Sequence, residues 1–420
     1  MSGRRVDIEV ERVAGESKLV VYLEGESVRV NYVSTLGERL FERLVVGREY
    51  WKVPYIASRI CGVCSHAHFW ASNLALENAL GLEVNEATAM LRDVCNKLQI
   101  TENHLVHLSL LALPDYAELP RNFLLKALAT REVLKNTLEL LCGRLSNPQP
   151  YVPGGFTFTI TKWHLERALQ RVKSTLPVVE ELVEEVFNAL KLPTARDPSP
   201  NYVSLNHWPR YSVPPGGPYR LTSNLGEFEV SPESYTEVFW ETPRTNSSSK
   251  ECTLRGAPFF VGARARALAK GYEGLEVSAL EVLKSNPYSN LLAKALEVRY
   301  LLEDVRKTLE NLVEKRFKKS TPARSAGRGI GVVEAPRGLL IHYYELSGDG
   351  VVKKANIITP TVMFTRHVED SAEDLVKSLL YLGTPEVEII KRVEMLVRAY
   401  DPCIPCAVHL VKVLKRGGSQ

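Results

Sequence analysis

The sequence has no long apolar run and little excess of charge of either sign. No stretch approaches the ~18–20 apolar residues that a membrane-spanning helix needs, so direct insertion into a bilayer is not expected. The net charge is only +4 over 420 residues, which does not favour nucleic acid as a partner. With 45% apolar and 24% charged residues, the chain has the composition of a globular protein with a sizeable core.

Cysteine is sparse too, with seven residues in the whole chain. An odd number spread over so long a chain does not fit the disulfide framework of a small secreted protein. Arg4 and Arg5 are not followed by an apolar stretch, so neither a secretory nor a twin-arginine signal is predicted. We therefore expect a reducing, cytoplasmic setting, unless a partner subunit carries an export signal or a membrane anchor.

Hydrophobic periodicity predicts an α+β fold that is mainly α, with a central bundle of long helices, N-terminal antiparallel strands and a C-terminal β-hairpin. The strands are expected at 6–10, 18–23 and 27–30, and the hairpin at 339–346 and 351–358. The helices are expected at 69–80, 85–113, 121–141, 162–190, 287–319, 370–382 and 385–399.

We expect one large domain, residues 1–420, in which successive segments differ in character. The segments are N-terminal strands leading to a cysteine loop (1–60), a helical bundle (69–192), an irregular wrapping region (193–262), helices and a hairpin (263–400), a second cysteine loop (401–409) and a tail (410–420). The segment 193–262 is too aromatic for a flexible linker, so it is expected to cover the core.

Two Cys-x-x-Cys pairs, Cys61/Cys64 and Cys403/Cys406, lie near opposite ends of the chain. Structural zinc sites usually join pairs only ~15–20 residues apart, and a thioredoxin-like site needs one pair only. Four thiolates from such distant segments suit a soft transition metal such as nickel, while an iron–sulfur cluster stays open at this point. The other three cysteines, Cys95, Cys142 and Cys252, are expected to be packing residues.

Two strings resemble the metal signatures of nickel–iron hydrogenase large subunits. They are Arg59-Ile60-Cys61-Gly62-Val63-Cys64 with His68, and Asp401-Pro402-Cys403-Ile404-Pro405-Cys406 with His409. Further strings in the family's order and spacing are 104–108, 111–115, 152–156, 334–338 and 359–361. The resemblance covers nearly the whole chain. It implies a catalytic subunit that splits dihydrogen reversibly and heterolytically into protons and electrons.

The resemblance implies a role for each of the four cysteines. Cys61 and Cys403 would be terminal nickel ligands. Cys64 and Cys406 would bridge the nickel to an iron that carries carbon monoxide and cyanide. The proton released from dihydrogen would go to the Cys403 sulfur or to Arg337.

Other residues are implied around the same centre. Arg337 would lie beside the metals, with Asp115 and Asp401 as the counter-charges of its buried guanidinium. Thr361 would donate a hydrogen bond to a cyanide, and His68 to a bridging sulfur.

A second metal site is implied beneath the first. Magnesium, or iron, would be held by Glu42, by a backbone carbonyl near Ile357 and by His409, with waters completing an octahedron.

The chain departs from the family pattern at several positions. Ala14 occupies the place of a glutamate that relays protons in the family, and alanine carries no proton. Glu16 lies two residues further along and shares a strand face with Ala14, so we predict that Glu16 or water replaces the missing carboxylate. Asn147, Phe364 and Ala399 also differ from the usual residues.

Partners follow from the resemblance as well. Because no further cysteine clusters are present, a small subunit with iron–sulfur clusters would have to receive the electrons. Further subunits would carry flavin and NAD(P), or reduce a deazaflavin. A maturation endopeptidase would remove the tail 410–420 after His409. Two other functions stay open from the sequence: a hydrogenase-derived metal scaffold without turnover, and a structural zinc protein.

Overall fold

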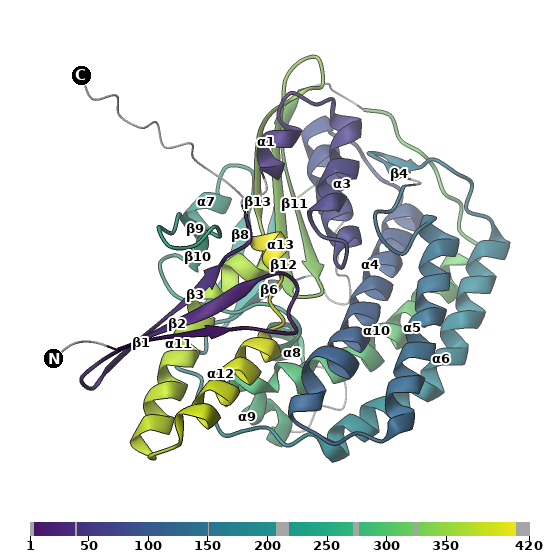
Figure 1. Ribbon diagram of the computed structural model, residues 1–420. Coiled ribbons are helices and arrows are strands. Elements are labelled where there is room, and N and C mark those ends of the chain that lie inside the picture. The colour runs from purple at the N-terminus through teal and green to yellow at the C-terminus, as the bar shows by residue number, and fades with distance from the viewer. Residues whose placement is uncertain are drawn as a thin grey trace, which may run out of the picture.

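The computed structural model describes residues 4–37, 40–149, 151–206, 218–271, 277–322 and 326–408 (Figure 1). The strands are β1 (Arg4–Glu9), β2 (Ser17–Glu24), β3 (Ser27–Ser34), β4 (Tyr151–Val152), β5 (Gly155–Phe156), β6 (Val203–Leu205), β7 (Tyr219–Ser223), β8 (Gly226–Val230), β9 (Phe239–Thr242), β10 (Glu251–Leu254), β11 (Gly327–Ala335), β12 (Gly338–Leu346) and β13 (Val352–Ile358). All paired strands among them are antiparallel, apart from isolated bridges.

The α-helices are α1 (Phe41–Val45), α2 (Val53–Ala57), α3 (Ser65–Leu80), α4 (Glu86–Val106), α5 (Arg121–Cys142), α6 (Lys162–Ala189), α7 (Tyr235–Val238), α8 (Ala263–Lys270), α9 (Val277–Ser285), α10 (Asn290–Leu312), α11 (Pro360–Tyr381), α12 (Glu386–Tyr400) and α13 (Ile404–Ala407). A π-helical turn, His107–Ala112, continues α4. The 3₁₀ turns are Tyr50–Lys52, Ser58–Ile60, Leu113–Asp115 and Pro287–Ser289.

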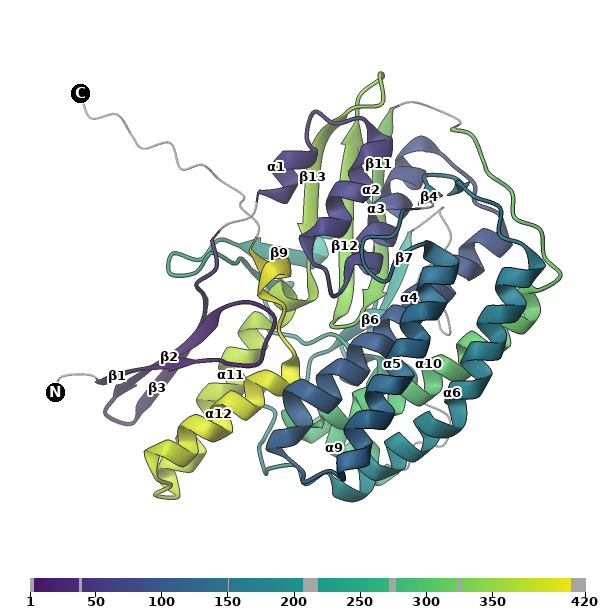
Figure 2. The same ribbon diagram turned by 45° about the vertical axis from the view of Figure 1, so that its right-hand side comes forward.

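Three bodies of structure surround the core. The long helices α4, α5, α6 and α10 form a bundle on one side (Figure 2). The sheet β11–β12–β13 stands beside it, with α3 packed on β11 and β12. The N-terminal sheet β1–β2–β3 lies against α11 on the other side, and α12 packs on α11 (Figure 1). The cysteine pairs lie at the ends of elements in two of these bodies: Cys61 and Cys64 precede α3, and Cys403 and Cys406 follow α12.

The approach of α3 to β11 depends on two glycines of that strand. A Cβ atom on Gly329 would lie 2.0 Å from the carbonyl oxygen of Ala75, and one on Gly331 would lie 2.1 Å from that of Ala71. Only glycine permits such contact between a strand and a helix backbone. The two glycines therefore set how closely α3 packs on β11, and the first cysteine loop leads into the N-terminus of α3.

The mainly helical α+β fold is confirmed, and several details differ from the sequence prediction. The predicted hairpin is present as β12 and β13, but β11 makes it a three-stranded sheet. The prediction missed β11 because its glycines are typical of turns. Helix α11 begins at Pro360, ten residues before the predicted start, and α10 ends at Leu312 rather than Lys319.

The segment 193–262 is more regular than predicted. It contains the sheet β6–β7–β8 and the pair β9–β10, whose strands are too short to show a clear alternation. Helices α8 and α9 follow this segment and were not among the individual helices predicted above. The division of the chain into segments stays a prediction. Within the described residues, no helix is both long enough and apolar enough to cross a bilayer.

Candidate metal centre

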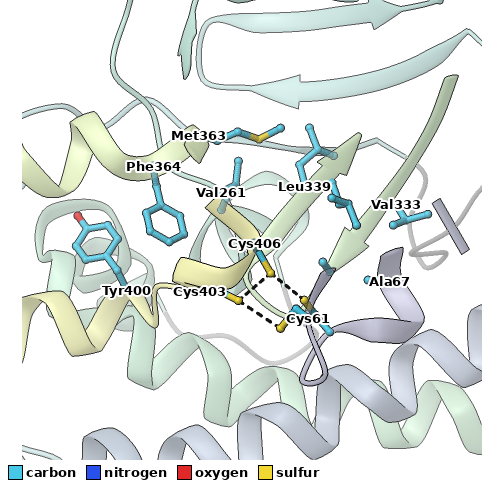
Figure 3. Close-up of a cluster of buried hydrophobic side chains, with 14 of the residues drawn as sticks. Cys61, Ala67, Val261, Val333, Leu339, Met363, Phe364, Tyr400, Cys403 and Cys406 are labelled. Atoms are coloured by element: carbon cyan, nitrogen blue, oxygen red, sulfur yellow. Dashed lines mark hydrogen bonds between the residues drawn. The ribbon is translucent and has the colours of Figure 1, made fainter. Parts of the chain in front are cut away.

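The two cysteine pairs, far apart in sequence, meet in one buried pocket. Cys61 follows the 3₁₀ turn Ser58–Ile60, and Cys64 precedes α3. Cys403 immediately precedes α13, and Cys406 lies within that helix. Figure 3 shows the sulfur atoms of the two segments pointing toward one another. The four Sγ atoms all lie within 4.8 Å of one another, and each cysteine is at most 5% exposed.

Individual sulfur distances show how tight the cluster is. Sγ of Cys61 lies 3.4 Å from that of Cys403, and Sγ of Cys64 lies 3.3 Å from that of Cys406. Cys403 and Cys406 are 2.7 Å apart. Hydrogen bonds from the other thiols, that of Cys403 first, hold the pKa of Cys61 well below its usual value. Burial, together with the neighbouring sulfurs, raises the pKa of Cys406.

Backbone contacts fix the second cysteine loop. The amide of Cys403 donates to Oγ1 of Thr361 at 2.9 Å, and the amide of Ile404 donates to the carbonyl of Ala14 at 2.8 Å. Ala14 and Cys403 form a parallel bridge. Gly15, with φ +90°, has no room for a side chain, because a Cβ would lie 2.9 Å from Ile404 and from Pro405. The N-terminal strand region thus clamps this loop.

A separate loop clamps the first cysteine pair. Oγ of Ser146 donates to the carbonyl of Gly62 at 2.8 Å, and the amide of Asn147 donates to Oγ of Ser65 at 2.9 Å. Asn147 adopts a left-handed backbone with φ 56°, which asparagine tolerates better than most residues. Sequence reasoning noted Asn147 only as a departure from the family pattern and missed Ser146.

A buried arginine lies beside the cluster. Nε of Arg337 donates to the carbonyl of Asp401 at 2.6 Å, and Nη2 donates to its carboxylate at 2.8 Å. Burial alone lowers the pKa of Arg337, but Asp401 and the sulfurs of Cys403, Cys64 and Cys61 outweigh burial and hold it well above its usual value. Nη1 is buried and has no hydrogen-bond partner among the described residues. A donor is thus left over on the guanidinium.

The contacts of Asp115 correct one expectation. Asp115 pairs with Arg12 and, at 2.6 Å, with Nε of Arg398, so it is not the counter-charge of Arg337. Asp401 is the carboxylate that pairs with Arg337, and it has a second cationic partner, Lys294 of α10, whose Nζ donates to it at 2.6 Å. The prediction failed because the π-helical turn and the 3₁₀ turn after it aim Asp115 toward the N-terminal strand region.

Two histidines, His68 of α3 and His342 of β12, form a buried pair. Nδ1 of His68 lies 3.0 Å from Nε2 of His342, whose other nitrogen lies 2.8 Å from the hydroxyl of Tyr344. The chain of polar groups fixes the ring of His68, whose amide donates to the carbonyl of Cys64. The expected hydrogen bond from His68 to a bridging sulfur stays a prediction.

Comparison with known proteins decides the family. A model described as nickel-dependent hydrogenase matches residues 39–123 and 282–409, which include all four cysteines of the cluster. The sulfhydrogenase 2 subunit alpha of Pyrococcus furiosus is 34% identical over 424 residues, covering 96% of this chain and 98% of the relative. The chain belongs to the nickel–iron hydrogenase large subunits. It is the catalytic subunit of an oxidoreductase that acts on dihydrogen.

Other hydrogenase subunits are similar to this chain over nearly its whole length. The sulfhydrogenase 1 subunit alpha of P. furiosus is 30% identical, covering 96% of this chain and 97% of the relative. The coenzyme F420 hydrogenase subunit alpha of Methanothermobacter thermautotrophicus is 27% identical, covering 98% and 96%. A crystal structure of an NAD+-reducing NiFe hydrogenase in the H2-reduced state superposes with a TM-score of 0.81 at 22% identity, covering 97% of this chain and 100% of that one.

The donor set of the hydrogenase fits a nickel–iron site. Four thiols that share one buried pocket cannot all ionise without compensating positive charge, and Arg337 supplies only one such charge. Divalent metal ions provide the remainder, and thiolates favour nickel and iron over hard cations. Cys61, Cys64, Cys403 and Cys406 are the residues that hold the site. Family membership sets aside the structural-zinc alternative.

The second expected metal site is only partly described. Glu42 is buried, and its Oε1 accepts from the amide of Ile357 at 3.1 Å and lies 3.4 Å from Nζ of Lys250. Its Oε2 is buried without a hydrogen-bond partner among the described residues. Burial raises the pKa of Glu42 despite the nearby ammonium. His409 lies outside the described residues, so its predicted role as a ligand is untested.

The position at which the resemblance implies a proton relay lies beside the second cysteine loop. Ala14 forms a bridge with Cys403 there and carries no ionisable group. Glu16 is exposed to solvent.

The sequence prediction missed Lys294 because this residue lies among apolar residues of a regular helix. A lone lysine in the string Leu291-Leu292-Ala293-Lys294-Ala295-Leu296 is nevertheless a signal of a paired, buried charge.

Proposed function

We propose that the sulfur of Cys403, rather than Arg337, accepts the proton when dihydrogen is split heterolytically. The chemistry that a bound nickel–iron centre with carbon monoxide and cyanide on iron would supply is polarisation of dihydrogen and storage of its two electrons. The protein then has to receive a proton at a fixed atom. The guanidinium of Arg337 is a poor base, because its pKa is held well above the usual value.

Arg337 has a different role in this proposal. Its two hydrogen bonds to Asp401 fix the plane of the guanidinium, and Nη1 remains as a donor. A fixed cation in a water-poor pocket stabilises charge that develops as the H–H bond breaks. It also offers a hydrogen bond to a cyanide. Asp401 is the counter-charge that offsets the cost of burying the guanidinium.

Thr361 and His68 complete the proposed surroundings. Oγ1 of Thr361 accepts the amide of Cys403, which leaves the hydroxyl hydrogen to donate to the other cyanide. His68 donates to a bridging sulfur, with His342 fixing its ring. Asp115 supports the site indirectly, because it joins Arg12 to Arg398 close to the second cysteine loop.

Magnesium, or iron, is proposed at Glu42, the carbonyl near Ile357, and His409. The partnerless buried Oε2 of Glu42 supports a cation there. Such a cation would join the region of α1 to the end of the C-terminal loop. Chelation followed by thermal unfolding tests the site. A fall in melting temperature that added magnesium or iron(II) reverses is expected, and an unchanged melting temperature would count against it.

We propose further that the chain works in the cytoplasm with a small subunit that holds iron–sulfur clusters. Among the described residues, the four cysteines of the active centre are the only group of three or more cysteines close enough to share a metal, so electrons need a carrier elsewhere. Flavin and NAD(P) subunits, or a deazaflavin-reducing subunit, would complete the assembly. A maturation endopeptidase would remove 410–420, so intact Gln420 in active, nickel-loaded protein would refute the trimming.

The observation that carries the proposal is the convergence of four buried sulfurs beside a fixed arginine. Isotope exchange between D2 and water tests heterolytic cleavage without an electron acceptor. We expect the complex to form HD, and a Cys403→Ser variant to lose HD formation. Infrared bands of carbon monoxide and cyanide should appear in the same preparation. Full HD formation by Cys403→Ser would exclude its sulfur as the proton acceptor.

A further inference from the structure

Asp401 sits between two buried cations. Arg337 approaches one carboxylate oxygen, Oδ1, and Lys294 approaches the other, Oδ2. All three residues are at most 5% exposed. Asp401 is the first residue after α12 and has a left-handed backbone conformation (φ 54°). It lies two residues before Cys403 in the chain, and its carboxylate contacts Arg337 and Lys294. The position of Arg337 therefore depends on a carboxylate with two partners.

The histidine near Asp401 does not replace either cation. Nε2 of His107 lies 3.8 Å from Oδ1, but it lies 2.8 Å from the carbonyl of Arg398. A carbonyl only accepts, so Nε2 of His107 carries the hydrogen and donates there. Burial lowers the pKa of His107 to about 3, so the ring is neutral. Lys294 is thus the second charged partner of Asp401.

Other charges around Lys294 are already paired. Glu297, one turn along α10, accepts two hydrogen bonds of 2.6 Å from Arg266 and one of 2.8 Å from His104. Arg266 also binds Glu334 at 2.7 Å. Asp401 is therefore the carboxylate that holds the ammonium of Lys294. Two cations on one carboxylate leave one net positive charge, next to four sulfurs that become negative when they bind metal.

We propose that Lys294 is a positioning residue of the hydrogenase: its ammonium holds the Asp401 carboxylate so that the guanidinium of Arg337 stays fixed beside the cysteine cluster, and it adds the positive charge that the cluster needs. A buried ammonium costs stability unless it is paired, and an apolar side chain would fit this helix face at lower cost. The inference rests on the role proposed above for Arg337.

The test compares Lys294→Met and Lys294→Arg with a matched control, Lys97→Met, in the assembled enzyme. Lys97 is as buried as Lys294 and pairs with Asp93 and Asp304, both at 2.5 Å, on α4 and α10. Both methionine variants remove a buried ammonium. Lys97→Met takes the shared cation from two carboxylates, Asp93 and Asp304, whereas Asp401 keeps Arg337 in Lys294→Met. General damage to folding should therefore be at least as large in the control.

We expect Lys294→Met to lower kcat about 10- to 100-fold per bound nickel, with a small change in KM, because a misplaced catalytic group slows the chemical step. The infrared bands of ligands on iron should move to lower wavenumber as positive charge is lost. Lys294→Arg should restore most of the rate and the band positions. Lys97→Met should keep both, whatever its melting temperature.

Equal rates per nickel and equal band positions in Lys294→Met and Lys97→Met would overturn the inference. Arg337→Lys separates that result from failure of the underlying proposal. If Arg337→Lys loses activity while Lys294→Met behaves like the control, the inference alone is wrong. If Arg337→Lys keeps wild-type activity, the role proposed for Arg337 fails first, and the inference about Lys294 falls with it.

Discussion

Asp401 accepts two hydrogen bonds from Arg337, one on its carboxylate and one on its own backbone carbonyl. This two-point contact needs the planar fork of a guanidinium, which a lysine cannot reproduce. We therefore predict that Arg337→Lys lowers kcat for dihydrogen oxidation about 100- to 1,000-fold, since a preorganised donor beside the reacting bond is lost. Dye-linked activity per bound nickel measures the effect. Wild-type kcat in Arg337→Lys would contradict it.

The glycine contact between β11 and α3 predicts a stability effect. In Gly331→Ala the new Cβ would lie 2.1 Å from the carbonyl oxygen of Ala71 and 2.6 Å from the amide of Ala75. Relief of this overlap requires α3 to move, which should cost about 3 kcal/mol or more and reduce nickel content. Gly348→Ala is the control, because a Cβ there meets no atom within 4 Å. Chemical unfolding should separate the two variants, and equal stabilities would refute the contact.

The hydroxyl of Thr361 predicts a second effect on the cysteine loop. Thr361→Val keeps the shape of the side chain but leaves the buried amide of Cys403 without its acceptor. An unpaired buried amide costs about 1–3 kcal/mol. We expect a lower melting temperature and weaker nickel retention in Thr361→Val, while Thr361→Ser keeps both. A valine variant as stable as the serine variant would show that the hydrogen bond contributes nothing.

A buried histidine predicts sensitivity to acid. Burial lowers the pKa of His104 from 6.5 to about 4, so the unfolded chain binds the proton more tightly than the folded one. The free energy of unfolding should therefore fall as the pH drops from about 6.5 toward 4, with about 2 kcal/mol lost between pH 7 and pH 5 through this residue. Urea unfolding at both pH values, for wild type and His104→Gln, measures the loss. An identical pH dependence in the two proteins would contradict the assignment.

The sequence reveals the metal ligands far better than it reveals their surroundings. Each cysteine pair is a local string, so Cys61, Cys64, Cys403 and Cys406 are visible without any knowledge of the fold. The partners of Asp401 are not local, because Lys294 lies 107 positions and Arg337 64 positions away along the chain and no spacing rule links them. The family pattern also misassigned Asp115, since its direction depends on how the chain leaves the π-helical turn.

Long helices were predicted well because their apolar residues repeat every three to four positions over many turns. Strand β11 and the short strands of 193–262 were missed for the opposite reason. The glycines of β11 mark close backbone approach rather than a turn, and only the position of α3 reveals that. Helix α11 begins early because Pro360 fits the first turn of a helix, where its missing amide hydrogen is not needed.

Nickel K-edge X-ray absorption of the purified enzyme tests most directly whether the head and tail cysteines hold one nickel–iron site. We predict sulfur scatterers in the first shell of nickel, supplied by the four cysteines of the cluster, and iron as a near second-shell scatterer. Replacing either Cys61 or Cys403 by serine should remove sulfur from that shell. A nickel shell made of nitrogen and oxygen alone, with no iron neighbour, would contradict the account.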